Sequence, residues 1–232
     1  MFPLQDTMPS RGFPFVTWML IVINVLVFLA EAQMGPAELE VVLRGLGVVP
    51  VRLLHDFSLA EIGTVFSSMF LHGGLTHLIG NMWFLHIFGD NVEDRLGTWN
   101  YLVFYVLAGF VAALTQTMMH PGDSTPMIGA SGAISGVLGA YSVLFPESQV
   151  ITLIPVFIIP YFVRVPAVFF LGLWFIMEFF SGFFSLAGAN ADNASVAFWA
   201  HVGGFVFGMV VAVLLVKPTP ERPRYRDEYQ PW

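Results

Sequence analysis

Ser131 and His201 are the two side chains whose types and settings best suit them to chemistry. Ser131 stands in the glycine-rich run Gly129–Gly136, inside a hydrophobic stretch. A serine there is either interhelical packing material or a nucleophile, and a nucleophilic serine needs an adjacent base. His201 lies near the start of another apolar stretch that is rich in glycine, so it is the candidate base. Together they would support the cleavage of an amide bond.

His77 and Asn81 could supply the second requirement of amide hydrolysis. The tetrahedral intermediate carries an oxyanion, which needs preorganised hydrogen-bond donors. An imidazole and a carboxamide are suitable donors, and their i, i+4 spacing places them on one helix face. The alternative interpretation is that both are ordinary interhelical hydrogen-bonding residues.

The composition indicates that these residues work in a membrane. Of the 232 residues, 56% are hydrophobic and 11% are charged, and the mean hydropathy is +0.75. A soluble domain of this size could not bury so much apolar surface. The chain has no cysteine, which excludes disulfides and thiolate metal sites. The net charge of −7 comes without a basic patch for nucleic acid.

The order of apolar segments predicts an all-α membrane protein, a six-transmembrane-helix bundle spanning residues 13–216. The segments are 13–30, 65–88 (with the helix beginning near Leu75), 101–119, 127–145, 165–186 and 196–216. Residues 31–64 are amphipathic and predict a membrane-surface loop between helices 1 and 2. Residues 90–97 predict a polar turn, and 155–166 are interrupted by prolines. Residues 1–12 and 217–232 are interpreted as a cytoplasmic segment and a disordered cytoplasmic tail.

The positive charges predict the orientation of this bundle. With both termini in the cytoplasm, seven Lys and Arg residues lie inside and two, Arg44 and Arg52, lie outside. The first segment is read as a span and not as a cleaved signal peptide, because a long region with an acidic residue precedes it. Segments two, four and six then run inward, so His77, Ser131 and His201 reach a similar depth below the outer surface.

Small residues indicate which helix faces meet. Ser131, Gly132, Ser135, Gly136 and Gly139 share one face of the fourth segment. A second stripe on the sixth segment consists of His201, Gly204, Gly208 and Ala212. Stripes of this kind allow transmembrane helices to approach closely. If the two faces meet, Ser131 and His201 meet with them.

Four motifs resemble those of the rhomboid family of intramembrane serine proteases, in the family's order. They are His72-Gly-Gly-Leu-Thr-His77-Leu-Ile-Gly-Asn81, Val92-Glu93-Asp94-Arg95-Leu96-Gly97, Gly129-Ala-Ser131-Gly132 and Ala200-His201-Val-Gly-Gly204-x-x-x-Gly208. The resemblance implies a Ser131–His201 dyad, with His77, Asn81 and the Ser131 backbone N–H as the oxyanion hole. It also implies that Gly129 and Gly132 allow a tight backbone there.

Two residues raise questions that the resemblance does not answer. The family often carries an aromatic residue four positions after the nucleophile, where it packs on the histidine; here Ser135 stands there, and a hydroxyl could orient His201 only by hydrogen bonding. Glu178 is the only carboxylate within an apolar segment. We interpret it as structural or as facing a wet cavity, because no acid is evident as a third catalytic residue.

The resemblance also implies how water and substrate reach the site. A polar cavity open to the outside would be lined by His72, His77, Asn81, Ser131 and Ser135. Substrate would enter between segments two and five, where bulky residues are available as a gate. These are Trp83, Phe84, Phe169, Phe170 and Trp174.

The resulting hypothesis is a serine endopeptidase of the plasma membrane that cleaves transmembrane protein substrates within the lipid bilayer. No cofactor, metal or nucleic acid is expected as a partner, and no motif specifies the oligomeric state. A catalytically inactive relative that binds transmembrane helices is the second hypothesis. A transporter is the third, disfavoured because the polar residues cluster near one face and not at the midplane. A metalloprotease is disfavoured, because the chain has no His-Glu-x-x-His motif.

Overall fold

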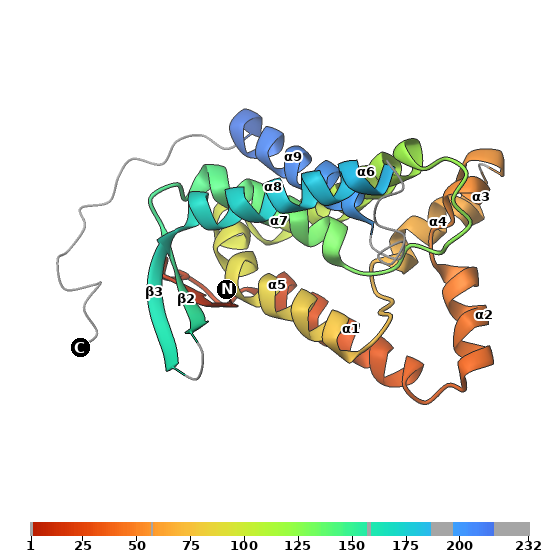
Figure 1. Cartoon of the computed structure of the whole chain (residues 1–232), viewed down its shortest axis with the longest axis horizontal. Coiled ribbons are helices and arrows are strands. Elements are labelled where there is room, and N and C mark those ends of the chain that lie inside the picture. The colour runs from red at the N-terminus through yellow and green to blue at the C-terminus, as the bar shows by residue number, and fades with distance from the viewer. Residues whose placement is uncertain (1, 57, 157–158, 187–196, 216–232) are drawn as a thin grey trace.

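The computed structural model describes residues 2–56, 58–156, 159–186 and 197–215. The predicted tail 217–232 lies outside these residues. The chain is mostly helical, and each apolar segment carries one long helix (Figure 1). These helices are α1 (Phe15–Glu31), α5 (Leu75–Leu96), α6 (Thr98–Met119), α7 (Ser131–Leu144), α8 (Ala167–Leu186) and α9 (Phe198–Leu215). Within the described residues, α6 and α8 are long and apolar enough to cross a membrane, whereas α1, α7 and α9 are shorter apolar helices.

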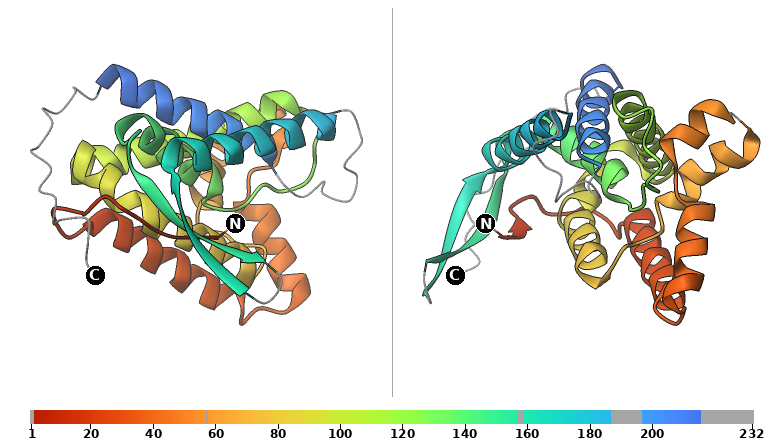
Figure 2. Two further views of the ribbon diagram at one scale, coloured as in Figure 1. Left: turned by 60° about the vertical axis from the view of Figure 1, so that its left-hand side comes forward. Right: turned by 45° about the vertical axis from the view of Figure 1, so that its right-hand side comes forward.

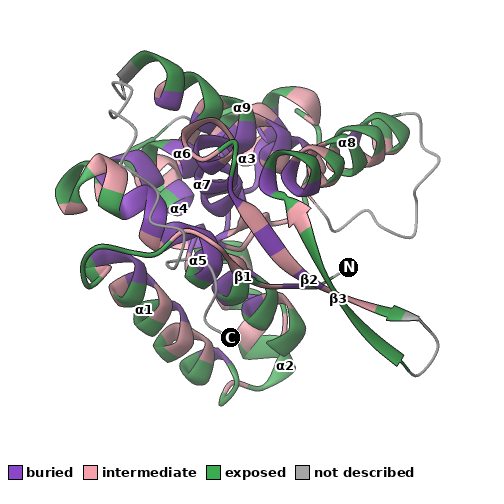
Figure 3. Ribbon diagram, turned by 90° about the vertical axis from the view of Figure 1, so that its left-hand side faces the viewer, coloured by how far each residue is buried: buried purple, intermediate pink, exposed green. Residues whose placement is uncertain are grey.

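Helix α7 lies at the centre of the bundle. Every residue from Gly132 to Tyr141 is buried, and α5, α6, α8 and α9 all pack against this helix (Figure 2). Helix α1 packs on α5, and α8 packs mainly on α9. The coloured burial of Figure 3 shows the same gradient, from buried α7 to largely exposed α8. Ser131, the first residue of α7, is therefore held by the best-packed element.

Three short helices form the predicted surface segment between α1 and α5. They are α2 (Pro36–Leu46), α3 (Pro50–His55) and α4 (Leu59–Ser68), and they lie at one end of the bundle (Figure 1). Proline begins α2 and α3, where its missing N–H costs nothing. The Ser58 hydroxyl caps α4 by accepting the N–H of Glu61.

The predicted polar turn at 90–97 is wrong, because α5 continues through it to Leu96. Gly97, with a φ of 82°, then ends the helix. The polar residues of this last part have partners on α1. Both Glu93 carboxylate oxygens accept backbone N–H groups at the start of α1, from Val16 at 2.9 Å and Thr17 at 2.8 Å. A buried carboxylate thus occupies a helix N-terminus, where the helix dipole favours it.

The prediction of an all-α fold is also wrong, because a three-stranded antiparallel sheet lies at the other end of the bundle. Its order is β1 (Phe2–Asp6), β2 (Gln149–Val156) and β3 (Ile159–Pro166). Prolines prevent a helix over 155–166, and the β-branched and aromatic residues between them favour strands. Figure 3 shows β1 beside α5 and the β2–β3 hairpin below α8.

Asp6 joins this sheet to the bundle. Its carboxylate accepts hydrogen bonds from the Tyr141 hydroxyl on α7 and, at 2.8 Å, from the Asn91 amide on α5. Burial raises the pKa of Asp6 to about 7. Phe2–Asp6, within the N-terminal segment 1–12, therefore contribute to the folded unit.

Candidate active site

Ser131 is the first residue of α7, and not a residue four positions into the helix as predicted. Backbone pairing holds the chain before it: Met127 pairs with Val48, and the Gly129 N–H donates to the Ser68 carbonyl at 2.8 Å. No side chain caps the N-terminus of α7. The first N–H groups of a helix have no partner within it, and they favour negative charge. Ser131 thus stands beside a natural binding site for an anion.

His201 is brought directly to Ser131, at a distance of 2.8 Å between Nε2 and Oγ. Helix α9, which carries His201, begins three residues earlier at Phe198. The Gln116 side chain of α6 fixes this beginning, since its Oε1 accepts the N–H groups of Trp199 at 3.0 Å and Ala200 at 3.3 Å. The role of Gln116 was not anticipated, although an amide inside an apolar segment was a visible signal.

The glycine stripes meet as predicted and explain the short distance. A Cβ atom on Gly204 would lie 2.1 Å from the Gly132 carbonyl oxygen, and one on Gly208 would lie 1.9 Å from that of Gly136. The backbones of α7 and α9 are thus in direct contact along both stripes. The pairing of the two helix faces, which the sequence predicted, sets the Ser131–His201 geometry.

The position of Glu178 beside His201 is the main feature of the site that was not predicted from the sequence. Its Oε2 lies 2.8 Å from His201 Nδ1, on the opposite side of the imidazole from Ser131. Glu178 was interpreted as structural or as facing a wet cavity, and its contact with His201 was not predicted. Trp174, one turn earlier on α8, has its ring centroid 5.9 Å from that of His201.

Ser135 does not orient His201. Its hydroxyl donates to the Ser131 carbonyl at 2.6 Å, along its own helix, and its side chain is buried. The alternative in which this hydroxyl bonds the imidazole is thus not realised. The His201 imidazole contacts Ser131, Glu178 and the Trp174 ring.

His77 and Asn81 lie beside Gly129, in the segment that leads into Ser131. A Cβ atom on Gly129 would come within 2.7 Å of the His77 ring and 3.6 Å of the Asn81 amide nitrogen. Gly129 also has a φ of 119°, so both space and backbone conformation require glycine there. The Asn81 amide lies 3.0 Å from His72 Nε2, and the His72 N–H donates to the Glu31 carboxylate at 3.3 Å. His72 thus holds the Asn81 amide in position through this contact.

The residues predicted to line an open cavity differ in exposure. Ser131 and His77 are half-buried, whereas His72, Asn81 and Ser135 are buried. The residues predicted to form a gate also differ from one another in exposure. Phe169 is 70% exposed, but Phe170 is packed in the core. Trp83 is half-exposed, and its indole N–H donates to the Pro3 carbonyl at 2.6 Å.

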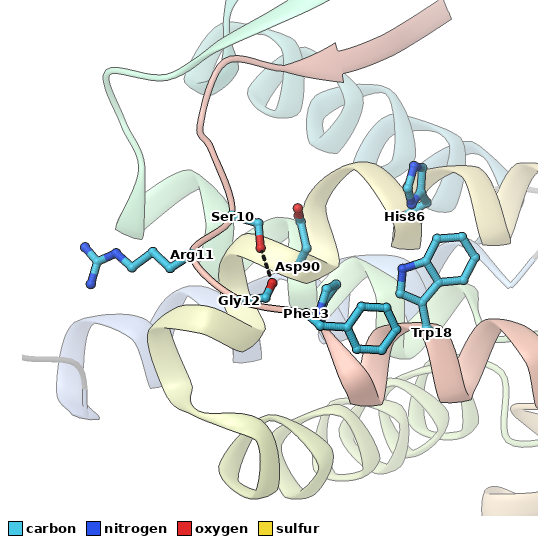
Figure 4. A pocket seen from close by; sticks show the side chains of 8 residues that line it. Ser10, Arg11, Gly12, Phe13, Trp18, His86 and Asp90 are labelled. Atoms are coloured by element: carbon cyan, nitrogen blue, oxygen red, sulfur yellow. Dashed lines mark hydrogen bonds between the residues drawn. The ribbon is translucent and has the colours of Figure 1, made fainter. Parts of the chain in front are cut away.

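A separate cavity of about 490 Å³ lies toward the far end of α5 from His77. Residues of the N-terminal segment, of α1 and of α5 line it, including Arg11, Trp18, His86 and Asp90 (Figure 4). Asp90 is thirteen residues after His77 on the same helix, roughly 20 Å along its axis. This cavity therefore contains none of the residues around Ser131.

Known proteins are similar in sequence to this chain over most of its length. Residues 60–218 match the family described as Rhomboid domain. RHOMBOID-like protein 5 of Arabidopsis thaliana is 30% identical over 76% of this chain and 50% of its own length. Rhomboid protein 1, mitochondrial, of Saccharomyces cerevisiae is 29% identical over 75% and 47%.

Bacterial relatives match a larger share of the chain. Rhomboid protease GlpG of Salmonella choleraesuis is 26% identical over 91% of this chain and 66% of its own length. The chain spans about half the length of the first two relatives and about two-thirds of the third. The match to the family covers more than half of the chain. This protein therefore belongs to the rhomboid family.

Proposed function

We propose that the chain is an intramembrane serine endopeptidase in which Ser131 is the nucleophile and His201 is the general base. The observation that carries the proposal is the 2.8 Å contact between Ser131 Oγ and His201 Nε2 at the uncapped start of α7. Its relatives include proteins named rhomboid proteases. A packing serine would need neither a histidine partner nor an open helix N-terminus beside it.

The reaction follows the general scheme of a serine protease. Ser131 Oγ attacks the carbonyl carbon of the scissile bond while its proton passes to His201 Nε2. That proton then goes to the leaving amine, which departs and leaves an acyl-enzyme. Water adds to the ester carbonyl by the same proton route in reverse, which releases the acid and restores Ser131.

The oxyanion formed in each half-reaction needs donors already in place. The Ser131 N–H at the start of α7 is one candidate donor, and the His77 ring and the Asn81 amide, which lie beside Gly129, are the others. Losing one such donor costs about 10²–10³ in rate in a studied protease. The contact of Asn81 with His72 holds the amide ready without reorganisation.

The lengths of the helices support a site below the membrane surface. Helix α7 has 14 residues and is about 21 Å long, against a hydrocarbon thickness of about 30 Å. If its far end reaches the other boundary, Ser131 lies about 9 Å inside the bilayer. We propose six spans, with the α2–α4 end outside and both termini in the cytoplasm of a plasma membrane, as the distribution of Arg and Lys favours.

The substrates we propose are transmembrane proteins that reach Ser131 laterally between α5 and α8. Among the described residues, these two helices make few contacts with each other, because α5 packs on α1 and α7 and α8 packs on α9. Trp83 on α5 and Phe169 on α8 are exposed along this side. Phe84 and Trp174 are half-buried there.

The proposal is tested by labelling with a fluorophosphonate probe in detergent and by cleavage of a reconstituted transmembrane substrate. We expect the wild type to react and the Ser131→Ala and His201→Ala variants to lose both activities. Ser142→Ala is a matched control, since this serine lies on the same helix and, among the described residues, its hydroxyl bonds the carbonyl of Gly139. It should react like the wild type.

Two results would contradict this assignment. Labelling that persists in Ser131→Ala would remove Ser131 as the nucleophile. A folded wild type that neither labels nor cleaves would favour a relative that binds transmembrane helices without cutting them.

A further inference from the structure

Glu178 meets the one nitrogen of His201 that the proposed reaction leaves free. Its Oε2 lies 2.8 Å from Nδ1, while Nε2 lies 2.8 Å from Ser131 Oγ. We propose that Glu178 is a positioning residue, so that Ser131, His201 and Glu178 act as a triad and not as the expected dyad. This inference rests on the proposed function, since it assigns a role within the same reaction.

The protonation state of the imidazole gives the first argument. To accept the Ser131 proton, a neutral His201 must have a bare Nε2 and carry its hydrogen on Nδ1. That hydrogen needs an acceptor, and the Glu178 carboxylate is the acceptor within reach. Its presence stabilises the reactive tautomer and also the imidazolium that forms during attack.

The packing of α8 on α9 gives the second argument, because it fixes Glu178 in register. Trp174, Glu178 and Gly182 recur at four-residue intervals and form one stripe along α8. Gly182 contacts Trp199, whose indole N–H donates to the Gly182 carbonyl at 3.2 Å. At the other end, the Trp174 ring lies against His201 and Phe205. Glu178 lies between these two contacts, opposite His201.

The cost of a carboxylate within an apolar helix gives the third argument. Such a group is expensive in a membrane and normally has a partner. Within the described residues, the only ion pair of Glu178 is with His201, and the two side chains are 18% and 13% exposed. Water is largely excluded from the contact, which strengthens it relative to a surface pair.

Alternative ways of holding the imidazole are absent or weaker in the described part of the chain. The Ser135 hydroxyl is committed to the Ser131 carbonyl. The Trp174 ring is inclined by 38° to the imidazole, so it forms a wall and offers Nδ1 no acceptor. Glu178 therefore supplies what the aromatic residue expected at position 135 would otherwise provide, and it adds a negative charge.

The test compares Glu178→Gln and Glu178→Asp with the wild type, using the fluorophosphonate labelling rate and the kcat and KM for a transmembrane substrate. Glutamine keeps the shape of the side chain but cannot hold the imidazolium. In studied triads the loss of the carboxylate costs about 10⁴-fold. We expect a loss of about 10²–10⁴-fold in kcat, with KM unchanged. Aspartate restores the charge at a shorter reach and should recover part of the loss.

Ser185→Ala serves as the matched control on the same helix. Ser185 lies two turns beyond Glu178, and its hydroxyl bonds the Gly182 carbonyl, so the kinetics of this variant should match the wild type. A Glu178→Gln variant that reacts at the wild-type rate would overturn the triad while leaving the protease assignment intact. A wild type that does not react at all would overturn both.

A second measurement decides the question even if Glu178→Gln does not fold. Histidine is labelled with ¹⁵N in the Ser131→Ala variant, which keeps Glu178, and the Nδ1–H proton of His201 is observed by NMR. A hydrogen bond to a carboxylate moves this proton strongly downfield, and the signal should vanish in Ser131→Ala/His201→Ala. The absence of a downfield signal in folded Ser131→Ala would refute the contact and the triad with it.

Discussion

Gly204→Ala tests whether the direct contact of two helix backbones sets the geometry of the site. The added Cβ would lie 2.1 Å from the Gly132 carbonyl oxygen, whereas ordinary contacts begin at 3.4 Å. The shortfall is about 1.3 Å, and the atom in the way belongs to a backbone that cannot rotate aside. Helices α7 and α9 must therefore separate or slide.

The consequence for the site can be worked out from its neighbours. Gly132 follows Ser131, and Gly204 is one turn after His201, so a separation of α7 from α9 acts directly on both side chains. If it is fully transmitted, the distance from Ser131 Oγ to His201 Nε2 grows from 2.8 Å to about 4.1 Å, which is no longer a hydrogen bond. A misplacement of about 1 Å can cost about 10²-fold in rate. Overpacking adds a loss of about 1–3 kcal/mol in unfolding free energy.

The assay measures the fluorophosphonate labelling rate and the thermal midpoint of the same detergent-solubilised sample. Gly172→Ala is the control, because a Cβ at this position of α8 would meet nothing within 4 Å. That variant should keep its labelling rate and gain up to about 1 kcal/mol from helix propensity. Gly204→Ala should lose both rate and stability.

The two readouts separate the possible errors in this reasoning. A Gly204→Ala variant as stable as the wild type would show that the helices are not in direct contact at this position. A variant that is destabilised yet labels at the wild-type rate would show that the helices slide without opening the Ser131–His201 pair. Either result would refute the link between the glycine stripe and catalysis.

Three further predictions concern the side chains of Ser135, Glu93 and Asp6. Ser135→Ala should leave the labelling rate unchanged, because its hydroxyl bonds only its own helix; a loss of about tenfold or more would show that it acts on His201. Glu93→Ala leaves the first N–H groups of α1 without their acceptor and should lower the unfolding free energy by about 1–3 kcal/mol, measured by denaturation; an unchanged value would refute this capping role. Burial raises the pKa of Asp6 to about 7, so the folded state binds the proton more tightly than the unfolded chain, and stability should fall as pH rises from about 4 to about 7. Asp6→Asn should reduce that slope, and an identical slope in both proteins would contradict it.

The centre of the site was predictable because several independent signals coincide there. Glycine at every fourth position marks where helices touch, and a serine and a histidine stand at the start of such stripes on α7 and α9. The start of α5 at Leu75 was also predicted correctly, because Gly73 and Gly74 interrupt the apolar segment just before it. Each of these features depends on local sequence and on one pairing of faces.

Features that depend on more distant partners were missed. The chain at 90–97 looks like a turn, yet it is helical because the start of α1, about eighty residues away, receives the carboxylate of Glu93. Ser131 begins a helix and does not lie within one, because the preceding residues pair with Val48 and with the Ser68 carbonyl. Hydropathy cannot distinguish an apolar extended segment from an apolar helical one.

Glu178 shows most clearly why position along the chain is not enough. Counted from Leu186 at the end of α8, Glu178 lies eight residues in, and counted from Phe198 at the start of α9, His201 lies three residues in; these are about 12 Å and about 4.5 Å. That difference would keep the two side chains apart if both helices ended at one level. The two side chains meet because Gly182 packs on Trp199. This contact offsets α8 along α9, and the stripe of Trp174, Glu178 and Gly182 then faces the imidazole. Helix α8 is apolar on nearly every face, so periodicity does not reveal that stripe. A lone carboxylate one turn before a glycine was the available signal, and its partner followed only from the offset of the two helices.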